Sequence, residues 1–360
     1  MAFVFSIKDT YRQAVEAATG GKNTVMYDDK GNPSIMVAVP RFNISDVIAG
    51  GANTPHPAFI VNGVTKDIIY ISKYQNIVSD SRAYSVPFQD PANSLTFDSA
   101  VTYCKNKGAG WHLMSNAEWA AMALWCKQNG FMPRGNNNYG TDISAAWEKG
   151  KKTYSDDGVR TCRVATGSGP KGWAHDNSNE GIFDLNGNVN EWVGGLRLNN
   201  GEIQILRDNN AADNLKDQSA ASAEWQAIAA ADGALVAPGT AGTLKYDYTV
   251  APVANSANIE LTDTIVNLQP DDTASGSKSF ETLTAHAGIV VPGIAKALGL
   301  FPVDASHGGD YFYMRNNGER LPLRGGHWSS TSSAGVFNLY LDNPRTSVNT
   351  SLGFRCAYVG

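Results

Sequence analysis

The sequence predicts an α+β fold with much irregular structure, and three observations lead to this prediction. Turn residues between short β-forming runs near the N-terminus predict a hairpin. Two helix patterns lie at 97–107 and 116–129, and the last 40 residues are dense in β-forming residues. The 36 glycines and the charged fraction of only 18% favour turns and loops. At 360 residues and 42% hydrophobic content, the chain can bury a sizeable core, which excludes wholesale disorder.

The first 57 residues are expected to form a small N-terminal unit followed by a linker. A helix is predicted over 9–18, and the apolar runs within 24–39 flank a turn, so a hairpin should follow the helix. Residues 49–57 are rich in glycine and proline and predict the linker. The main domain is therefore expected over 58–360.

Within that domain, local signals predict a strand over 66–74 and a capped helix. Residues 115–118 read Ser-Asn-Ala-Glu, a capping box in which each end of the motif satisfies an unpaired amide of the first turn. Residues 199–310 differ in composition and are interpreted as an insertion. Within it, the alanine-rich stretch 219–231 and the apolar stretch 285–298 are expected to be helical.

Charge and hydropathy patterning limit the partners and the location that we expect. The net charge of −5 and the lack of a long basic run argue against a nucleic-acid partner. The short N-terminal apolar run is interrupted at Asp9, so no signal peptide is expected, and no stretch approaches the ~20 apolar residues of a membrane helix. The chain is thus expected to be made in the cytoplasm, with a phage virion (tail) or a cell surface as open destinations.

The cysteines, histidines and one glycine-rich motif favour structural roles. Four cysteines are too few for a disulfide scaffold and fit no zinc spacing, so free thiols are expected. The six histidines are scattered, which argues against a histidine-based metal site. Residues 167–172 match GxGxxG, but no helical pattern follows, so we interpret them as a loop rather than a dinucleotide site.

The segment 184–191 gathers oxygen-bearing side chains around Gly187. Hard cations such as calcium bind such oxygens together with backbone carbonyls. The segment is not an EF-hand loop, because Val189 occupies the sixth position, where that loop needs glycine. An asparagine-rich turn that hydrogen-bonds to itself is the alternative interpretation.

The C-terminal block alternates strictly between apolar and polar residues over 337–342. Two faces of a strand are predicted. Phe337, Leu339 and Leu341 should lie on one face and be buried, whereas the other face should carry Asn338, Tyr340 and Asp342. Apolar residues flank the neighbouring polar runs. This pattern favours a rigid scaffold that presents a changeable polar surface, with an edge strand and ordinary polar turns as the alternative.

Several motifs together resemble one family. Residues 181–192 (GIFDLNGNVNEW), 324–328 (RGGHW) and 353–356 (GFRC), with 112–119 (HLMSNAEW) and 69–74 (IYISKY), resemble the sulfatase-modifying, or formylglycine-generating enzyme, branch of the C-type lectin fold. The likeness covers about 66–198 and 311–360, with 199–310 as the insertion. It implies a C-type-lectin-like fold.

Within this branch, the C-terminal segment looks like that of the variable proteins of diversity-generating retroelements. In those proteins, adenine mutation of a template RNA changes AAC asparagine codons into codons for His, Ser, Tyr, Asp or Thr. The resemblance implies a variable region at about 324–355. Its ligand-binding side chains, expected to be mostly exposed and clustered on one face, would be His327, Ser329, Ser330, Ser333, Tyr340, Asp342, Asn343, Ser347, Asn349, Thr350 and Ser351.

The resemblance also implies a calcium site, although no cofactor is required. In the enzyme branch the loop resembling 184–191 looks like a calcium site. Carried onto this sequence, the ligands would be the side chains of Asn186 and Glu191 and the backbone carbonyls of Gly187 and Val189.

Three functions are weighed from the sequence. A ligand-binding display protein, with a protein or other macromolecular target, is favoured. An oxidase of the formylglycine-generating type is disfavoured, because a thiol mechanism needs a cysteine pair and residues 327–351 contain no cysteine. A purely structural surface or tail protein is the third reading. An enzyme is therefore not expected, and the sequence does not predict the oligomeric state.

Overall fold

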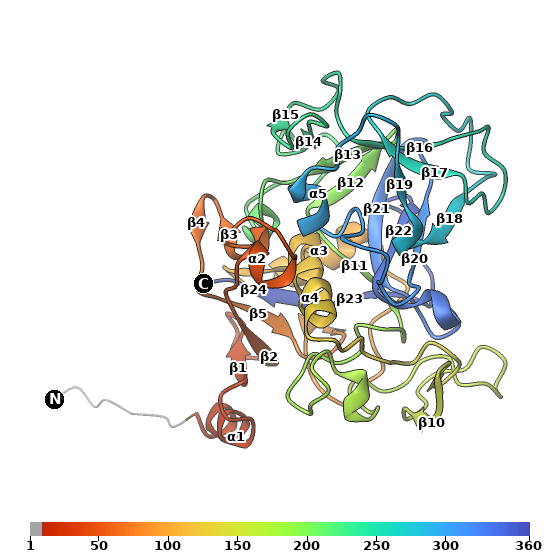
Figure 1. Cartoon of the computed structure of the whole chain (residues 1–360). Coiled ribbons are helices and arrows are strands. Elements are labelled where there is room, and N and C mark those ends of the chain that lie inside the picture. The colour runs from red at the N-terminus through yellow and green to blue at the C-terminus, as the bar shows by residue number, and fades with distance from the viewer. Residues whose placement is uncertain (1–8) are drawn as a thin grey trace.

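The computed structural model describes residues 9–360, which form two main sheets with helices packed between and beside them (Figure 1). The described helices are α1 (Thr10–Ala18), α2 (Ile44–Val47), α3 (Phe97–Lys105), α4 (Asn116–Gln128) and α5 (Gly293–Ala297). Helix α1 begins after Asp9, whose side chain accepts a hydrogen bond from the Arg12 amide. The helices predicted over 9–18, 97–107 and 116–129 are confirmed as α1, α3 and α4.

The first sheet joins both ends of the described chain. Its strands, in spatial order, are β1 (Asn23–Tyr27), β2 (Pro33–Pro40), β5 (Ile68–Ser72), β24 (Cys356–Tyr358) and β8 (Trp111–Leu113). The hairpin expected in the N-terminal unit is confirmed as β1 and β2. It does not stand apart, however, because residues 36–40 of β2 pair with β5. The apolar residues of this hairpin are thereby buried against the main domain rather than within a separate unit.

The second sheet contains most of the remaining strands. Its main path runs through β18 (Gly276–Ser279), β20 (Tyr311–Met314), β22 (Gly335–Asn343), β21 (Glu319–Gly325), β12 (Leu196–Asn199), β13 (Glu202–Ile205), β16 (Lys245–Tyr248), β17 (Ile259–Thr262) and β19 (Thr284–Ala285). Off this path lie β11 (Asn190–Trp192), β14 (Gln226–Ile228), β15 (Leu235–Val236) and β23 (Leu352–Phe354). The predicted insertion therefore extends this sheet through β13, β16 and β17.

Short two-stranded ladders complete the described strands. They are β3 (Ile60–Val61) with β4 (Val64–Thr65), β6 (Ile77–Ser79) with β7 (Arg82–Tyr84), and β9 (Thr141–Asp142) with β10 (Ala145–Lys149). The strand predicted over 66–74 is confirmed as β5, with its ends shortened.

Helix α4 lies in the middle of the molecule, between the first sheet and β22 (Figure 1). Ten of its thirteen residues are buried, which is typical of a helix enclosed on all sides. The predicted capping box is confirmed, because the Ser115 hydroxyl accepts from the Glu118 amide at 3.1 Å and the Glu118 carboxylate accepts from the Ser115 amide at 2.8 Å. The capped start places the helix so that the Trp119 indole donates to the carbonyl of Val336 in β22.

Two helical expectations within the insertion are wrong. Residues 219–231 form turns and the strand β14, because the side chains of Trp225, Ala227 and Ile228 are buried and β14 pairs with β13 and β15. Tertiary burial thus overrides the helix propensity of alanine. The stretch 285–298 contains only the five-residue helix α5, which begins directly after Pro292.

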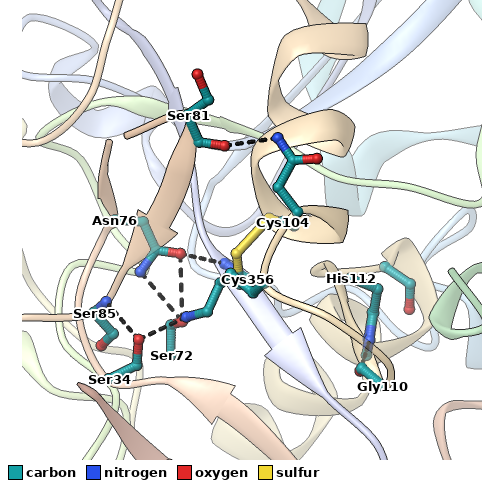
Figure 2. Close-up of a disulfide and its surroundings, with 12 residues drawn as sticks. Ser34, Ser72, Asn76, Ser81, Ser85, Cys104, Gly110, His112 and Cys356 are labelled. Atoms are coloured by element: carbon teal, nitrogen blue, oxygen red, sulfur yellow. Dashed lines mark hydrogen bonds between the residues drawn. A yellow bond between two sulfur atoms is a disulfide. The ribbon is translucent and has the colours of Figure 1, made fainter. Parts of the chain in front are cut away.

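The expectation of free thiols is wrong for two of the four cysteines. Cys104 on α3 and Cys356 on β24 form a disulfide across 252 residues of sequence, with their Cα atoms 5.7 Å apart (Figure 2). Packing of α3 against β8, which pairs with β24, brings the two residues together. In the same region, the Asn76 side chain accepts a hydrogen bond from the Cys356 amide (Figure 2).

Removing this disulfide is expected to destabilise the fold. Replacing both Cys104 and Cys356 by alanine should lower the free energy of unfolding by about 2–5 kcal/mol, because the bridge restricts a long loop of the unfolded chain. Denaturant unfolding under non-reducing conditions measures the change. Cys126→Ser, measured with and without reductant, is the control for thiol effects, because Cys126 is buried and forms no disulfide. Equal stability of the oxidised and reduced wild-type chain would contradict the prediction.

Candidate ligand-binding surface

Strand β22 forms the base of the candidate surface and is paired on both sides. Its Leu339–Leu341 stretch pairs in parallel with β20, and its antiparallel pairing with β21 shifts register twice. Phe337, Leu339 and Leu341 are at most 1% exposed and lie in the largest core cluster, as the alternation predicted. The backbone of the strand is therefore held by its ladders and by its inner face.

The outer face of β22 carries Tyr340 and Asp342, and both side chains are half-buried. Asn338 on the same face is fully buried, and its side-chain nitrogen donates to the Ser333 carbonyl at 2.8 Å. It therefore holds the preceding turn in place instead of facing solvent.

The predicted exposure of the candidate set is wrong for most of its members. Asn349 and Thr350 are exposed, whereas Ser330 and Ser351 are buried. The other members are half-buried, and they are His327, Ser329, Ser333, Tyr340, Asp342, Asn343 and Ser347.

Local hydrogen bonds account for the two buried serines. The Ser330 hydroxyl accepts from the His327 amide at 3.0 Å, and Ser351 donates its amide and its hydroxyl to the Asn349 side chain. These short-range contacts turn both hydroxyls inward. Nine of the predicted residues therefore remain accessible in part or in full.

Tyr340 stacks on an aromatic residue that lies outside the predicted variable region. Its ring lies parallel to that of Tyr313 on β20, with the ring centroids 4.0 Å apart and an interplanar angle of 2°. Tyr311 follows on the same face, with its ring centroid 5.8 Å from that of Tyr313. Burial raises the pKa of the Tyr340 hydroxyl, and the neighbouring Tyr313 raises it further.

Sequence reasoning missed both tyrosines of β20. The signal was present, because residues 311–314 alternate Tyr-Phe-Tyr-Met, and Phe312 and Met314 are fully buried. What the sequence could not show is that β20, from beyond the variable region, pairs directly with β22.

A cavity of about 220 Å³ lies where the variable segment meets the rest of the domain. Thr331 and Ser332 line it from the variable segment, and Asp142 and Asp310 line it from elsewhere. Burial holds the pKa of the Asp310 carboxyl well above its usual value, and this carboxyl accepts a hydrogen bond from the Phe337 amide at 2.7 Å. Gly335 is required beside it, because a Cβ there would overlap the Asp310 carboxyl group.

The loop 184–191 lies below this surface and is buried. The carbonyls of Gly187 and Val189 and the carboxylate of Glu191 converge, as the resemblance implied, but they converge on the side-chain nitrogen of Gln75. Asn186 is not brought to that point, because its side chain binds the Pro133 carbonyl and the Asn137 amide instead. Over residues 9–360, no group of three or more His, Cys, Asp or Glu side chains is placed to hold a metal ion.

The two cysteines outside the disulfide are poorly suited to thiol chemistry. Cys126 and Cys162 are both fully buried. Burial raises the pKa of each thiol, which disfavours the reactive thiolate.

The architecture and the surface together define a C-type-lectin-like domain of the α+β class. The chain belongs to the family of sulfatase-modifying factor enzyme 1-like domains, whose model matches residues 9–235. This match confirms the family that the motifs indicated. It begins before the hairpin of β1 and β2 and ends inside the insertion.

Three solved structures are among those similar to this chain. PvdO from Pseudomonas aeruginosa is 16% identical, with 93% of this chain and 97% of that chain covered and a TM-score of 0.36. Treponema denticola variable protein 1 is 12% identical, with 93% of this chain and 98% of that chain covered and a TM-score of 0.34. The Major Tropism Determinant M1 variant is 12% identical, with 93% of this chain and 71% of that chain covered and a TM-score of 0.31. No curated protein matches the chain.

Proposed function

We propose that this protein is a non-catalytic display protein whose C-terminal region, about 324–355, is diversified by a retroelement to bind macromolecular targets. One observation carries the proposal. On β22, three buried apolar side chains on one face fix the backbone, while Tyr340 and Asp342 on the other face stay accessible. A scaffold of this kind lets side chains change without unfolding the domain.

The size and chemistry of the surface suit a macromolecular target. A standard interface uses roughly 20–30 residues per partner, which is close to the length of the variable segment. Tyr340 supplies a rigid aromatic anchor, and its stacking on Tyr313 limits the entropy that its ring loses on binding. The serine, threonine and asparagine residues around it offer adaptable hydrogen bonds.

The absence of a suitable thiol pair favours binding over oxidation. The enzyme mechanism implied by the family name needs accessible cysteines, and residues 327–351 contain none. Along residues 9–360 no helix is long and apolar enough to cross a membrane, and exposure on a phage tail or at a cell surface would suit the proposed role.

A display library tests whether the surface supports new binding. We would randomise the nine accessible positions, which are His327, Ser329, Ser333, Tyr340, Asp342, Asn343, Ser347, Asn349 and Thr350. Most members are expected to fold, because the buried side chains of β22 and the pairing of this strand on both sides hold the backbone. Selection against unrelated proteins such as lysozyme should then yield binders.

A matched library provides the control. It would randomise nine exposed loop positions between 250 and 273, far from β22 in sequence, and should yield fewer binders. A first library that mostly fails to fold, or two libraries that yield binders equally, would contradict the proposal. The retroelement itself is tested by inspecting the genomic locus for a reverse transcriptase gene and an asparagine-rich near-copy of residues 324–355.

A further inference from the structure

The side chain of Gln75 fills the centre of the loop that resembles a calcium site. Gln75 follows β5 and is fully buried. Its amide nitrogen lies 3.0 Å from the Val189 carbonyl oxygen and 3.0 Å from a carboxylate oxygen of Glu191, and 3.3 Å from the carbonyl oxygens of Asp184 and Gly187. Four oxygens from one loop thus converge on a single hydrogen-bond donor.

A second set of contacts fixes which end of the Gln75 amide faces these oxygens. The Gln75 oxygen accepts from the Asn188 side-chain nitrogen at 2.9 Å. Asn188 cannot reverse its own amide, because its oxygen accepts from the Val164 backbone amide at 2.9 Å and from the Asn136 side chain at 3.1 Å. A reversed Gln75 amide would also place its oxygen against the four loop oxygens, where no proton is available.

The Glu191 carboxylate is already paired with a cation of the protein. The Glu191 carboxylate, which is 1% exposed, receives hydrogen bonds from two nitrogens of the fully buried Arg355, at 2.6 and 2.5 Å. The same guanidinium also donates to the Phe183 carbonyl at 3.0 Å. The only carboxylate among the four expected calcium ligands is therefore paired with a fixed cation, which weakens the attraction for a second one.

We infer that the Gln75 amide takes the place of a cation and that the protein closes this loop without calcium. Calcium needs six to eight oxygens at about 2.3–2.6 Å, whereas these oxygens surround a nitrogen that carries hydrogens at 3.0–3.3 Å. The expected ligand set of Asn186, Gly187, Val189 and Glu191 does not fit an ion, because Asn186 points elsewhere and Gln75 occupies the common point. Gln75 is then the residue that orders the loop.

Thermal unfolding with calcium chloride and with EDTA tests this inference on the full chain. The wild-type melting temperature should be the same in both solutions, because an ion that bound only the folded state would raise it. Gln75→Ala and Gln75→Glu should each melt several degrees lower than wild type in EDTA. The first leaves the carbonyls of Gly187 and Val189 without their donor, and the second sets a carboxylate against them.

Gln89→Ala is the matched control, because Gln89 lies close by in sequence, is exposed, and has a side chain whose hydrogen bond goes to the neighbouring Pro87 carbonyl. Its melting temperature should equal that of the wild type. A wild-type melting temperature that rises in calcium would overturn the inference. So would Gln75 variants that melt like the wild type in EDTA. If the Gln75 variants fail to fold, the wild-type comparison still decides whether calcium binds, and calorimetric titration with calcium chloride repeats the test without unfolding.

Discussion

Replacing Glu191 by alanine is expected to lower the free energy of unfolding by about 3–5 kcal/mol. The substitution leaves the Arg355 guanidinium, which is fully buried, without its anion, and an unpaired buried charge is strongly destabilising. Arg355→Ala should have an effect of the same size for the reciprocal reason. Denaturant unfolding in EDTA measures both, and an unchanged m-value would show that the difference lies in stability.

An exposed ion pair is the matched control for this prediction. Lys30 and Asp80 bind each other on the surface at 2.9 Å, and Lys30→Ala should leave stability unchanged within error, because water screens such pairs. The double variant of Glu191 and Arg355 should cost less than the sum of the two single variants, since it leaves no orphaned charge. Additive losses would show that the two side chains do not act as a pair.

Phe337→Ala is expected to cost about 3–5 kcal/mol by leaving a cavity under the candidate surface. The Phe337 side chain is 1% exposed, and its ring stacks on that of Phe280 with the ring centroids 5.7 Å apart. The His307 ring lies perpendicular to the Phe337 ring, with the centroids 4.6 Å apart. These neighbours come from segments held by other contacts, so the site can collapse only partly around an alanine. Thermal and denaturant unfolding of the purified variant measures the loss.

The contrast within the same segment makes the Phe337 prediction specific. Val348→Ala shortens a side chain that is 57% exposed in the same variable region and should shift stability by no more than about 0.5 kcal/mol. A similar loss for both variants would mean that the segment lacks the division between buried scaffold and changeable surface on which the proposed function depends.

Signals that act over a few residues predicted much of the fold. The capping box at Ser115, the N-cap at Asp9 and the hairpin of β1 and β2 each follow from backbone groups that neighbouring residues must satisfy. The alternation over 337–342 predicted the buried face of β22 for the same reason, because the period of a strand is set by its own geometry.

Contacts between distant segments could not be predicted in this way. The Cys104–Cys356 disulfide joins residues 252 apart, and Gln75 reaches the 184–191 loop from another part of the chain. Tyr313 meets Tyr340 only because β20 and β22 are neighbours in the sheet. The exposure of the candidate set was overestimated because hydrogen bonds among its own members, such as that from the His327 amide to Ser330, are set by turn geometry.

The position of β22 between β20 and β21 also bears on what happens across a population of sequence variants. Leu339 and Tyr340 each have a register partner on both neighbouring strands, so this part of β22 presents no free edge. A free edge would let some variants recruit a strand from another molecule and aggregate. With both sides of β22 occupied, a new side chain at position 340 changes only what the outer face presents. Selection can then act on the target that each variant binds, because variants do not aggregate through this strand.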